Sequence, residues 1–214
     1  RRCVAELAGL HAWSMTPDAA ATVAAFPSLD SPAARQAFPA LFAEGWDVYR
    51  EHARREIPSV VAAYGERIAE HVPRLLEGLT ERPGLIHGDI RADNLFFRGD
   101  ELAIVDFQLT ARGVGAGDIA YLVSQGLTTE TRDGGDERLV REYLELLAER
   151  GAPAYPFDEA WRHYRMGVVF FLLFPVIAIR GYAGLPEQAR ELCLRLCERS
   201  IATITDTDAL EVLA

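Results

Sequence analysis

The chain has 214 residues, of which half are hydrophobic and a quarter are charged, so it has enough apolar material for the core of a globular domain. All 22 basic residues are arginine, and with 32 acidic residues the formal net charge is 22 − 32 = −10. Neutralising phosphates requires basic clusters, so a nucleic-acid partner is not expected. No signal peptide is visible, and cysteines are few (Cys3, Cys193 and Cys197), which favours a cytoplasmic protein. Cys193 and Cys197 lie four residues apart on a predicted helix and are expected to be small buried residues.

The first 80 residues predict a helical subdomain. Helices are expected at residues 2–13, 40–55 and 58–79, with loop and short helix between residues 19 and 39. Pro73 is expected to kink or restart the third of these helices. No capping signal precedes the apolar stripe of the first helix (Val4, Leu7, Leu10 and Trp13), so we expect that an upstream segment has been removed.

Residues 81–128 are the only strand-rich part of the chain. Leu85-Ile86 predicts a short strand, and residues 95–97 and 102–105 predict two strands joined by a turn at residues 98–101. After the glycine-rich run from Gly113 to Gly117, a helix is expected from Asp118 to about Gln125, with Asp118 as its N-cap.

Residues 129–214 predict a second helical subdomain, with helices at residues 129–150, 158–179, 186–203 and 206–213. The most apolar stretch, residues 167–179, is interrupted by Pro175 and is too short to span a membrane. A buried core helix is therefore expected there, and no membrane partner. The fold class expected for the whole chain is mainly α with a small β-hairpin region.

One group of polar residues lies within the strand-rich segment. A strand ends at His87 and Asp89, Asn94 follows after one tight loop, and the hairpin brings Asp106 back to the same end of the strands. Carboxylate and amide oxygens gathered in this way suit metal-assisted phosphoryl transfer, because Mg²⁺ prefers oxygen ligands and few protein groups.

This spacing resembles the catalytic and metal loops of the protein-kinase-like fold. His87-Gly88-Asp89, with glycine in the middle, is similar to the aminoglycoside phosphotransferase and choline kinase superfamily. Asp106-Phe107-Gln108 followed by Asp118-Ile119-Ala120-Tyr121 looks most like the ecdysteroid-kinase-like branch of that superfamily. Two flanking segments, Leu7–Ala12 and His163–Gly167, carry weaker matches.

The resemblance implies ATP as co-substrate, Mg²⁺ as cofactor and a role for each residue of the group. These roles are catalytic base for Asp89, Mg²⁺ ligands for Asn94 and Asp106, a structural brace for His87, an anchor of the catalytic loop for Asp118, and a contact to the γ-phosphate for Arg91. Asp93 is expected to face solvent. His11, His52 and His71 are expected on helix surfaces or in packing, as are His163, Tyr164 and Arg165, although the last three could instead line an acceptor pocket.

Enzymes of this kind also need a nucleotide lobe with a strand lysine, and the sequence contains no lysine. We therefore expect the C-terminal lobe alone, with the N-terminal lobe supplied in cis or in trans, little activity of the isolated chain, and self-association through the exposed lobe face.

The function expected is ATP- and Mg²⁺-dependent phosphoryl transfer to a hydroxyl group of a small molecule. An aminoglycoside acceptor is conceivable, because an acidic cleft suits a polycation, whereas the apolar late helices favour a more hydrophobic alcohol. The alternative is a non-catalytic kinase-like lobe that acts as an interaction or regulatory module.

Overall fold

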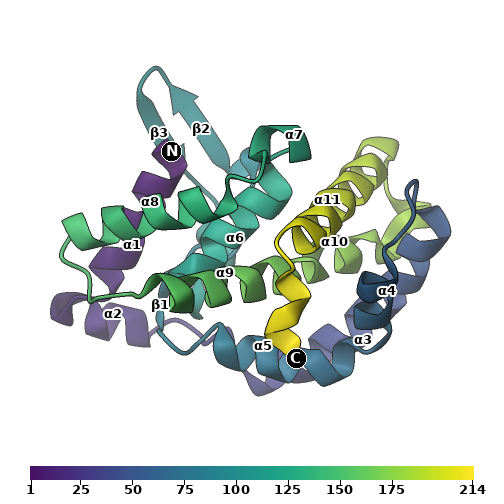
Figure 1. The fold of residues 1–214 in the computed structure, drawn as a ribbon, viewed down its shortest axis with the longest axis horizontal. Helices are drawn as coiled ribbons and strands as arrows, with labels where there is room; N and C mark the ends of the chain where they lie inside the picture. Colours follow the sequence, from purple (N-terminus) through teal and green to yellow (C-terminus); the bar gives the residue numbers. More distant parts are fainter.

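The computed structural model describes residues 1–214, which fold mainly into helices (Figure 1). The helices are α1 (Arg2–Ser14), α2 (Ala20–Ala24), α3 (Pro32–His52), α4 (Ser59–Glu66), α5 (Ile68–Gly78), α6 (Gly115–Gly126), α7 (Thr129–Arg132), α8 (Asp136–Glu149), α9 (Phe157–Phe171), α10 (Leu173–Ala178) and α11 (Glu187–Asp206). The 3-10 turns are η1 (Pro17–Ala19), η2 (Ala92–Asn94), η3 (Phe107–Leu109), η4 (Ile179–Gly184) and η5 (Ala209–Leu213). The strands are β1 (Gly84–Ile86), β2 (Leu95–Arg98), β3 (Glu101–Ile104) and β4 (Ala111–Gly113).

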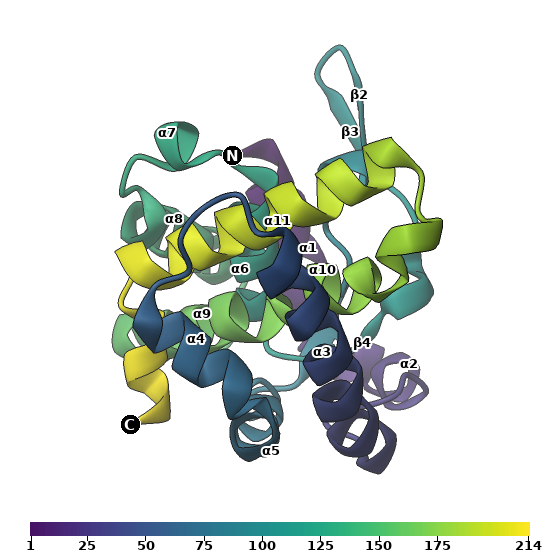
Figure 2. The same cartoon turned by 90° about the vertical axis from the view of Figure 1, so that its right-hand side faces the viewer.

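The four strands form two antiparallel pairs. β2 and β3 are consecutive and form a hairpin that projects from the body of the protein in both views (Figures 1 and 2). β1 pairs with β4, which we did not predict, and Leu85 lies opposite Arg112. A mainly helical fold with a small β region is thereby confirmed.

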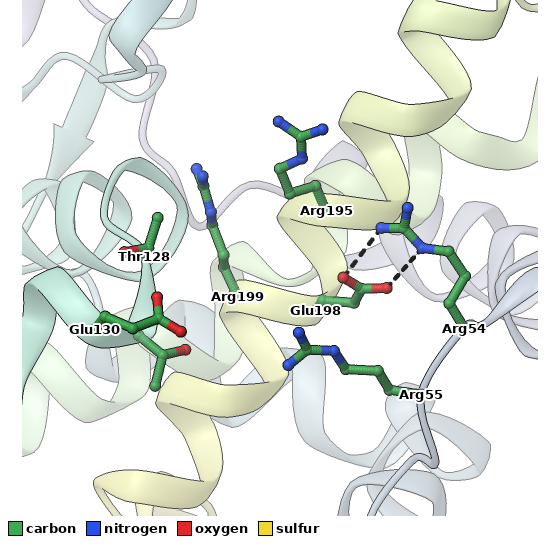
Figure 3. Close-up of a pocket in the computed structure, with 8 residues that line it drawn as sticks. Arg54, Arg55, Thr128, Glu130, Arg195, Glu198 and Arg199 are labelled. Atoms are coloured by element: carbon green, nitrogen blue, oxygen red, sulfur yellow. Dashed lines mark hydrogen bonds and ion pairs between the residues drawn. The ribbon is translucent and has the colours of Figure 1, made fainter.

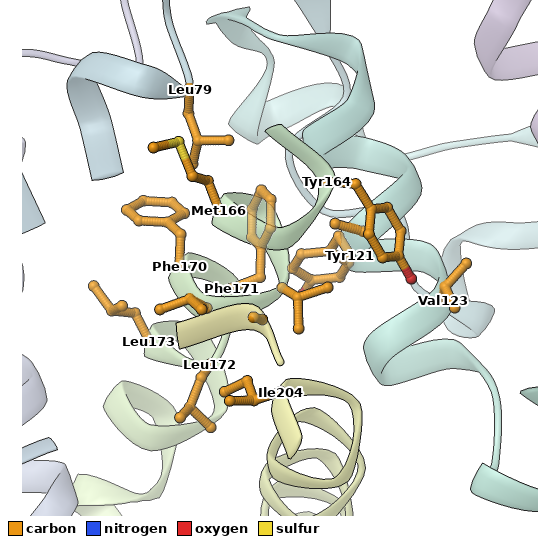
Figure 4. Close-up of a cluster of buried hydrophobic side chains, with 14 of the residues drawn as sticks. Leu79, Tyr121, Val123, Tyr164, Met166, Phe170, Phe171, Leu172, Leu173 and Ile204 are labelled. Atoms are coloured by element: carbon orange, nitrogen blue, oxygen red, sulfur yellow. The ribbon is translucent and has the colours of Figure 1, made fainter. Parts of the chain in front are cut away.

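The core is centred on α9, against which α6 packs (Figure 4). Two glycines permit this close crossing: a Cβ on Gly167 would lie 2.7 Å from the Ala120 Cβ and 3.1 Å from the Gly117 Cα. One continuous hydrophobic cluster contains residues from α1 to η5, so the helices before residue 80 and those after residue 129 share a single core. Cys193 and Cys197 are buried as expected, and Cys3 is buried as well.

Two helices begin earlier than predicted. α3 begins at Pro32 rather than residue 40, because the Ser31 hydroxyl caps it by accepting from the Ala34 amide at 3.1 Å. α6 begins at Gly115, so Asp118 lies inside its first turn and is not the N-cap. The glycine-rich run had suggested a loop at Gly115. A side chain there would collide with Tyr143 and His11, so close packing of the helix explains why this position is glycine.

Three predicted helices are each divided in two. The segment 129–150 breaks at Asp133 and Gly134, both of which adopt positive φ. The segment 58–79 breaks at Arg67 rather than at Pro73, which lies within α5. The segment 158–179 breaks between α9 and α10, close to Pro175. Proline lacks the amide that would bond to the carbonyl four residues earlier, and the Phe171 carbonyl instead accepts from the Gln125 side chain at 2.7 Å.

The last predicted helix, residues 206–213, is also shorter than expected. α11 continues to Asp206, and only the 3-10 turn η5 follows it. Asp208 adopts a left-handed conformation between the two and so ends the α-helix.

The segment Phe157–Gly184 is apolar and long enough to cross a membrane by length and composition. Within the fold, 61% of its most apolar window is buried in the protein. The core helix of a soluble protein passes the same test, so the segment is weak evidence for a membrane span.

Candidate active site

The loop that follows β1 presents Asp89 beside the body of the protein. Gly88 adopts a φ of +81°, and a Cβ there would collide with the Leu109 carbonyl, so this position requires glycine. Ile90 is fully buried and anchors the loop in the core. Asp89 therefore has a fixed position, and only 7% of its surface is exposed.

Three side chains hold the carboxylate of Asp89. Its Oδ1 accepts from the Tyr121 hydroxyl at 2.8 Å and from the Arg91 Nε at 2.9 Å. Its Oδ2 accepts two longer bonds, from the Asn94 Nδ2 at 3.2 Å and from the Arg91 Nη2 at 3.5 Å, and the same Asn94 nitrogen donates to the Asp89 carbonyl at 2.8 Å. Each oxygen thus has two donors, and the bonds to Oδ2 are the longer ones. Burial, followed by the Asp89 charge, raises the pKa of Tyr121, so its hydroxyl stays protonated and acts as a donor.

His87 connects the catalytic loop to the strand that leads to Asp106. Its Nδ1 accepts from the Asp89 amide at 3.2 Å, and its Nε2 lies 3.0 Å from the Val105 carbonyl. These partners assign the proton to Nε2. The side chain is fully buried and packs against the Phe107 ring at a tilted angle, with 4.6 Å between ring centroids. His87 therefore fixes the spacing between the two acidic loops.

Asp118 lies beneath the same loop with no exposed surface. Its Oδ2 accepts from the His87 amide at 2.6 Å, and its Oδ1 accepts from the Gly88 amide at 3.0 Å. His11 Nε2 is 3.2 Å from Oδ2, and His11 Nδ1 is 2.9 Å from the Tyr143 hydroxyl. A buried carboxylate needs such a full set of partners to offset its desolvation.

Asn94 and Asp106 lie at the same end of the β2–β3 hairpin. The ladder pairs Leu95 with Ile104, and the Val105 amide donates to the Asn94 carbonyl at 3.0 Å. Asp106 adopts a left-handed conformation with φ of 67° and has one weak contact, at 3.4 Å from the Gln108 amide nitrogen. Its exposed carboxylate is therefore available to a ligand.

These two residues suit a magnesium ion. No cluster of three or more His, Cys, Asp or Glu side chains is arranged to hold a metal by itself. The Asn94 amide nitrogen is turned to Asp89, which leaves its oxygen for a cation, and Asp106 adds a carboxylate. One amide and one carboxylate match the preference of Mg²⁺, which retains water and phosphate oxygens as its other ligands.

A cavity of about 270 Å³ opens beside Asp89, and we call it the acceptor pocket. Its lining is mainly apolar and consists of Asp89, Arg91, Leu109, Tyr121, Gln125, Phe174, Pro175, Ala178, Leu192, Cys193 and Leu196. Gln125 Oε1 is buried and has no hydrogen-bond partner in the protein. It is thus an acceptor at the wall of the pocket that a ligand could satisfy.

Sequence reasoning missed three residues of this site. Tyr121 was noted only as part of a motif, although its position three residues after Asp118 places both on one side of α6. His11 was expected on a surface or in packing, and it supports Asp118 from the interior. Gln125 gave no signal, because only the tertiary fold shows that the helix end reaches the pocket.

The remaining candidates lie outside the acceptor pocket. His163 is buried and lies 2.7 Å from the Tyr155 hydroxyl, and Tyr164 donates to Asp136 at 2.6 Å. Asp93 is exposed, with 68% of its side chain in contact with solvent. His52 stacks on Tyr182, His71 stacks on Tyr64, and Arg165 pairs with Glu211.

The comparisons with known proteins concern most of the chain. The model of the family described as "Phosphotransferase enzyme family" (APH) matches residues 1–161. A crystal structure from Ralstonia eutropha JMP134, described as a "putative aminoglycoside phosphotransferase", is similar with a TM-score of 0.53 and 16% sequence identity. That likeness concerns the fold alone. It covers 96% of this chain and 63% of the other, so this chain spans less than two thirds of that protein's length. No curated protein sequence matches this chain significantly.

Proposed function

We propose a function for this chain from the fact that it belongs to the phosphotransferase enzyme family. It supplies the catalytic base, the metal ligands and the acceptor pocket of an enzyme that transfers the γ-phosphoryl group of ATP to a hydroxyl group of a small molecule. The observation that carries this proposal is the placement of Asp89, which is fixed by Tyr121 and Arg91 at the wall of a mainly apolar pocket. The narrower resemblance to the ecdysteroid-kinase-like branch stays a prediction.

The contacts of Asp89 support a role as the base. Oδ1 has the two shorter bonds and Oδ2 the two longer ones, so Oδ2 is the oxygen that would accept the hydrogen of the acceptor hydroxyl. The hydroxyl oxygen would attack the γ-phosphorus as the bond to the β–γ bridging oxygen breaks, and ADP would leave. Asn94 and Asp106 would hold Mg²⁺, which when bound neutralises charge on the nucleotide phosphates.

Arg91 is proposed to contact the transferred phosphoryl group. Its guanidinium is paired with Asp89, and 31% of the Arg91 side chain is exposed. The donors that Asp89 does not use can therefore reach an incoming oxyanion. An Arg91→Ala variant of the full-length protein is expected to lose turnover. Unchanged turnover in that variant would exclude this role.

The lining of the pocket favours a hydrophobic alcohol over a polycation. Asp89 is the only carboxylate in the lining, and Arg91 offsets its charge. A polycationic acceptor would need several carboxylates. We therefore propose a small, largely apolar alcohol with one further donor group, which would bond to the free Oε1 of Gln125.

The nucleotide lobe is proposed to cover the face around the β2–β3 hairpin, whether it is supplied in cis or in trans. Large apolar side chains are exposed on this face, with 58% of Phe96, 62% of Phe97 and 49% of Phe107 in contact with solvent. Exposed apolar area of this kind indicates an interaction surface. The isolated chain is expected to have little kinase activity and to self-associate through this face.

A phosphate-transfer assay with the full-length protein tests the function. Radiolabelled ATP and a panel of hydroxyl compounds should give a labelled product. Asp89→Asn should lower turnover by a factor of about 10²–10⁴, the usual contribution of a general base. Asp93→Asn, which removes an exposed carboxylate from the same loop, should have little effect. Equal turnover in both variants would refute the role of Asp89, and no transfer by the full-length protein would favour the interaction or regulatory alternative.

A further inference from the structure

A second cavity, of about 240 Å³, lies between α7, α11 and the segment that joins α3 to α4 (Figure 3). No apolar side chain lines it. The lining residues are Arg54, Arg55, Thr128, Thr129, Glu130, Arg195, Glu198 and Arg199, and we call this the arginine pocket. It shares no lining residue with the acceptor pocket, although both use α11.

The acidic groups of the arginine pocket neutralise only part of its charge. Glu198 accepts two hydrogen bonds from Arg54, at 2.9 and 3.1 Å, which are the interactions dashed in Figure 3. Arg195 is paired with Glu191 at 2.9 Å. Glu191 also accepts two hydrogen bonds from Arg54, at 2.7 and 2.8 Å, so four arginines and three glutamates leave a formal charge of 4 − 3 = +1.

Two of the arginines have no carboxylate partner within 4 Å. Arg55 makes no ion pair and no side-chain hydrogen bond. Arg199 donates only to the Gln125 carbonyl, at 2.9 Å. Burial and then the neighbouring charge of Arg195 lower the pKa of Arg199, and the charge of Glu130 offsets only part of this effect.

We infer that the arginine pocket is a second ligand site, separate from the catalytic loop, that binds a phosphate dianion, either free or as the terminal group of a phosphate monoester. Guanidinium groups present planar forks of donors that match the oxygens of phosphate. Arg55 and Arg199 have no carboxylate partner, so their free donors can bind oxygens of the dianion. The absence of apolar lining indicates that the phosphate itself, rather than a hydrophobic body attached to it, is recognised.

Titration of the protein with inorganic phosphate at constant ionic strength tests this inference. Binding is measured by calorimetry and by the change in the thermal unfolding temperature. Saturable binding is expected for the unaltered protein. The Arg55→Gln/Arg199→Gln double variant should bind about tenfold more weakly or worse, because two charged donors are lost. Arg55→Glu is a second variant. Arg55 is exposed and makes no ion pair or side-chain hydrogen bond, so this variant should lose phosphate binding while its thermal unfolding temperature without phosphate stays unchanged.

Two control variants locate the binding. Arg67→Gln removes an exposed arginine on another surface and should leave phosphate binding unchanged. Arg91→Gln removes the arginine of the catalytic loop and should also leave it unchanged. Binding that is lost in Arg91→Gln but kept in the Arg55 and Arg199 variants would overturn the inference, as would the absence of saturable binding.

A parallel titration with glycerol 2-phosphate distinguishes the two sources of the dianion. Similar affinities for the ester and for inorganic phosphate would show that a terminal phosphate is recognised. Binding of inorganic phosphate alone would show that the pocket accepts only the free ion. Equal responses to phosphate and to chloride at the same ionic strength would show general screening and would refute the site.

Discussion

The hydroxyl of Tyr121 donates a 2.8 Å hydrogen bond to Oδ1 of Asp89, 32 residues away in the sequence. Tyr121 lies in the middle of α6, a rigid helix packed on the core, whereas Asp89 lies on a loop. The bond therefore holds the proposed base in a position that the helix determines, while the bonds to Oδ2 are longer.

Tyr121→Phe should lower turnover of the full-length protein by roughly tenfold, since a hydrogen bond to a charged group is worth about 1.5–3 kcal/mol. Tyr164→Phe is the matched control, because it removes a buried hydroxyl that donates to a carboxylate, Asp136, away from the site. Both variants should lose stability by thermal unfolding, and only the first should lose activity. Equal activity losses would mean that Tyr121 acts through stability alone.

His11→Phe should destabilise the fold by about 2–3 kcal/mol, since it removes a hydrogen bond to buried Asp118 and leaves the Tyr143 hydroxyl without its partner. Urea unfolding measures this free energy. His52→Phe is the control, because the His52 ring stacks on Tyr182 and phenylalanine preserves that stacking. A His11 variant as stable as the control would show that the two backbone amides alone satisfy Asp118.

Gly88→Ala should destabilise the protein by roughly 2–4 kcal/mol, because it combines the cost of a left-handed alanine with a collision at the Leu109 carbonyl. Gly99→Ala, in the β2–β3 turn, has a φ of +59° and no atom within 4 Å of the new Cβ. It should therefore show only the backbone cost, about 1–2 kcal/mol. Equal destabilisation of the two variants in urea unfolding would exclude the steric part.

The free energy of unfolding should decrease as pH falls below about 6.5 because of His163. Burial lowers the pKa of His163 in the folded state, so the unfolded chain binds a proton at higher pH than the folded chain does. This stabilisation is fully present above pH 6.5, the ordinary value, and is lost as pH falls through the lowered pKa. His163→Gln should flatten the dependence measured by urea unfolding between pH 7 and pH 5. Burial also lowers the pKa of His71, so a smaller slope should remain.

Local chemistry in the sequence was enough to indicate the family and the mainly helical class, and it predicts the loop that we propose to be catalytic. The spacing of His87, Asp89, Asn94 and Asp106 is a short-range pattern, and a hairpin with a turn near Gly99 necessarily returns Asp106 to the end where Asn94 lies. Helix periodicity likewise located most helices. It did not give their ends, because Ser31 capping and the positive φ at Asp133 and Gly134 decide where those helices begin and end.

Only the tertiary structure decided which distant residues complete the site. Tyr121, His11 and Gln125 reach the loop or the pocket because α6 and α1 pack beside it, and no periodicity in one sequence encodes such contacts. The arginine pocket likewise gathers side chains from α11, α7 and the segment after α3, which are far apart along the chain. The sequence thus determined the chemistry of each segment, and the packing of helices decided which segments act together, because burial and close contact depend on the whole core.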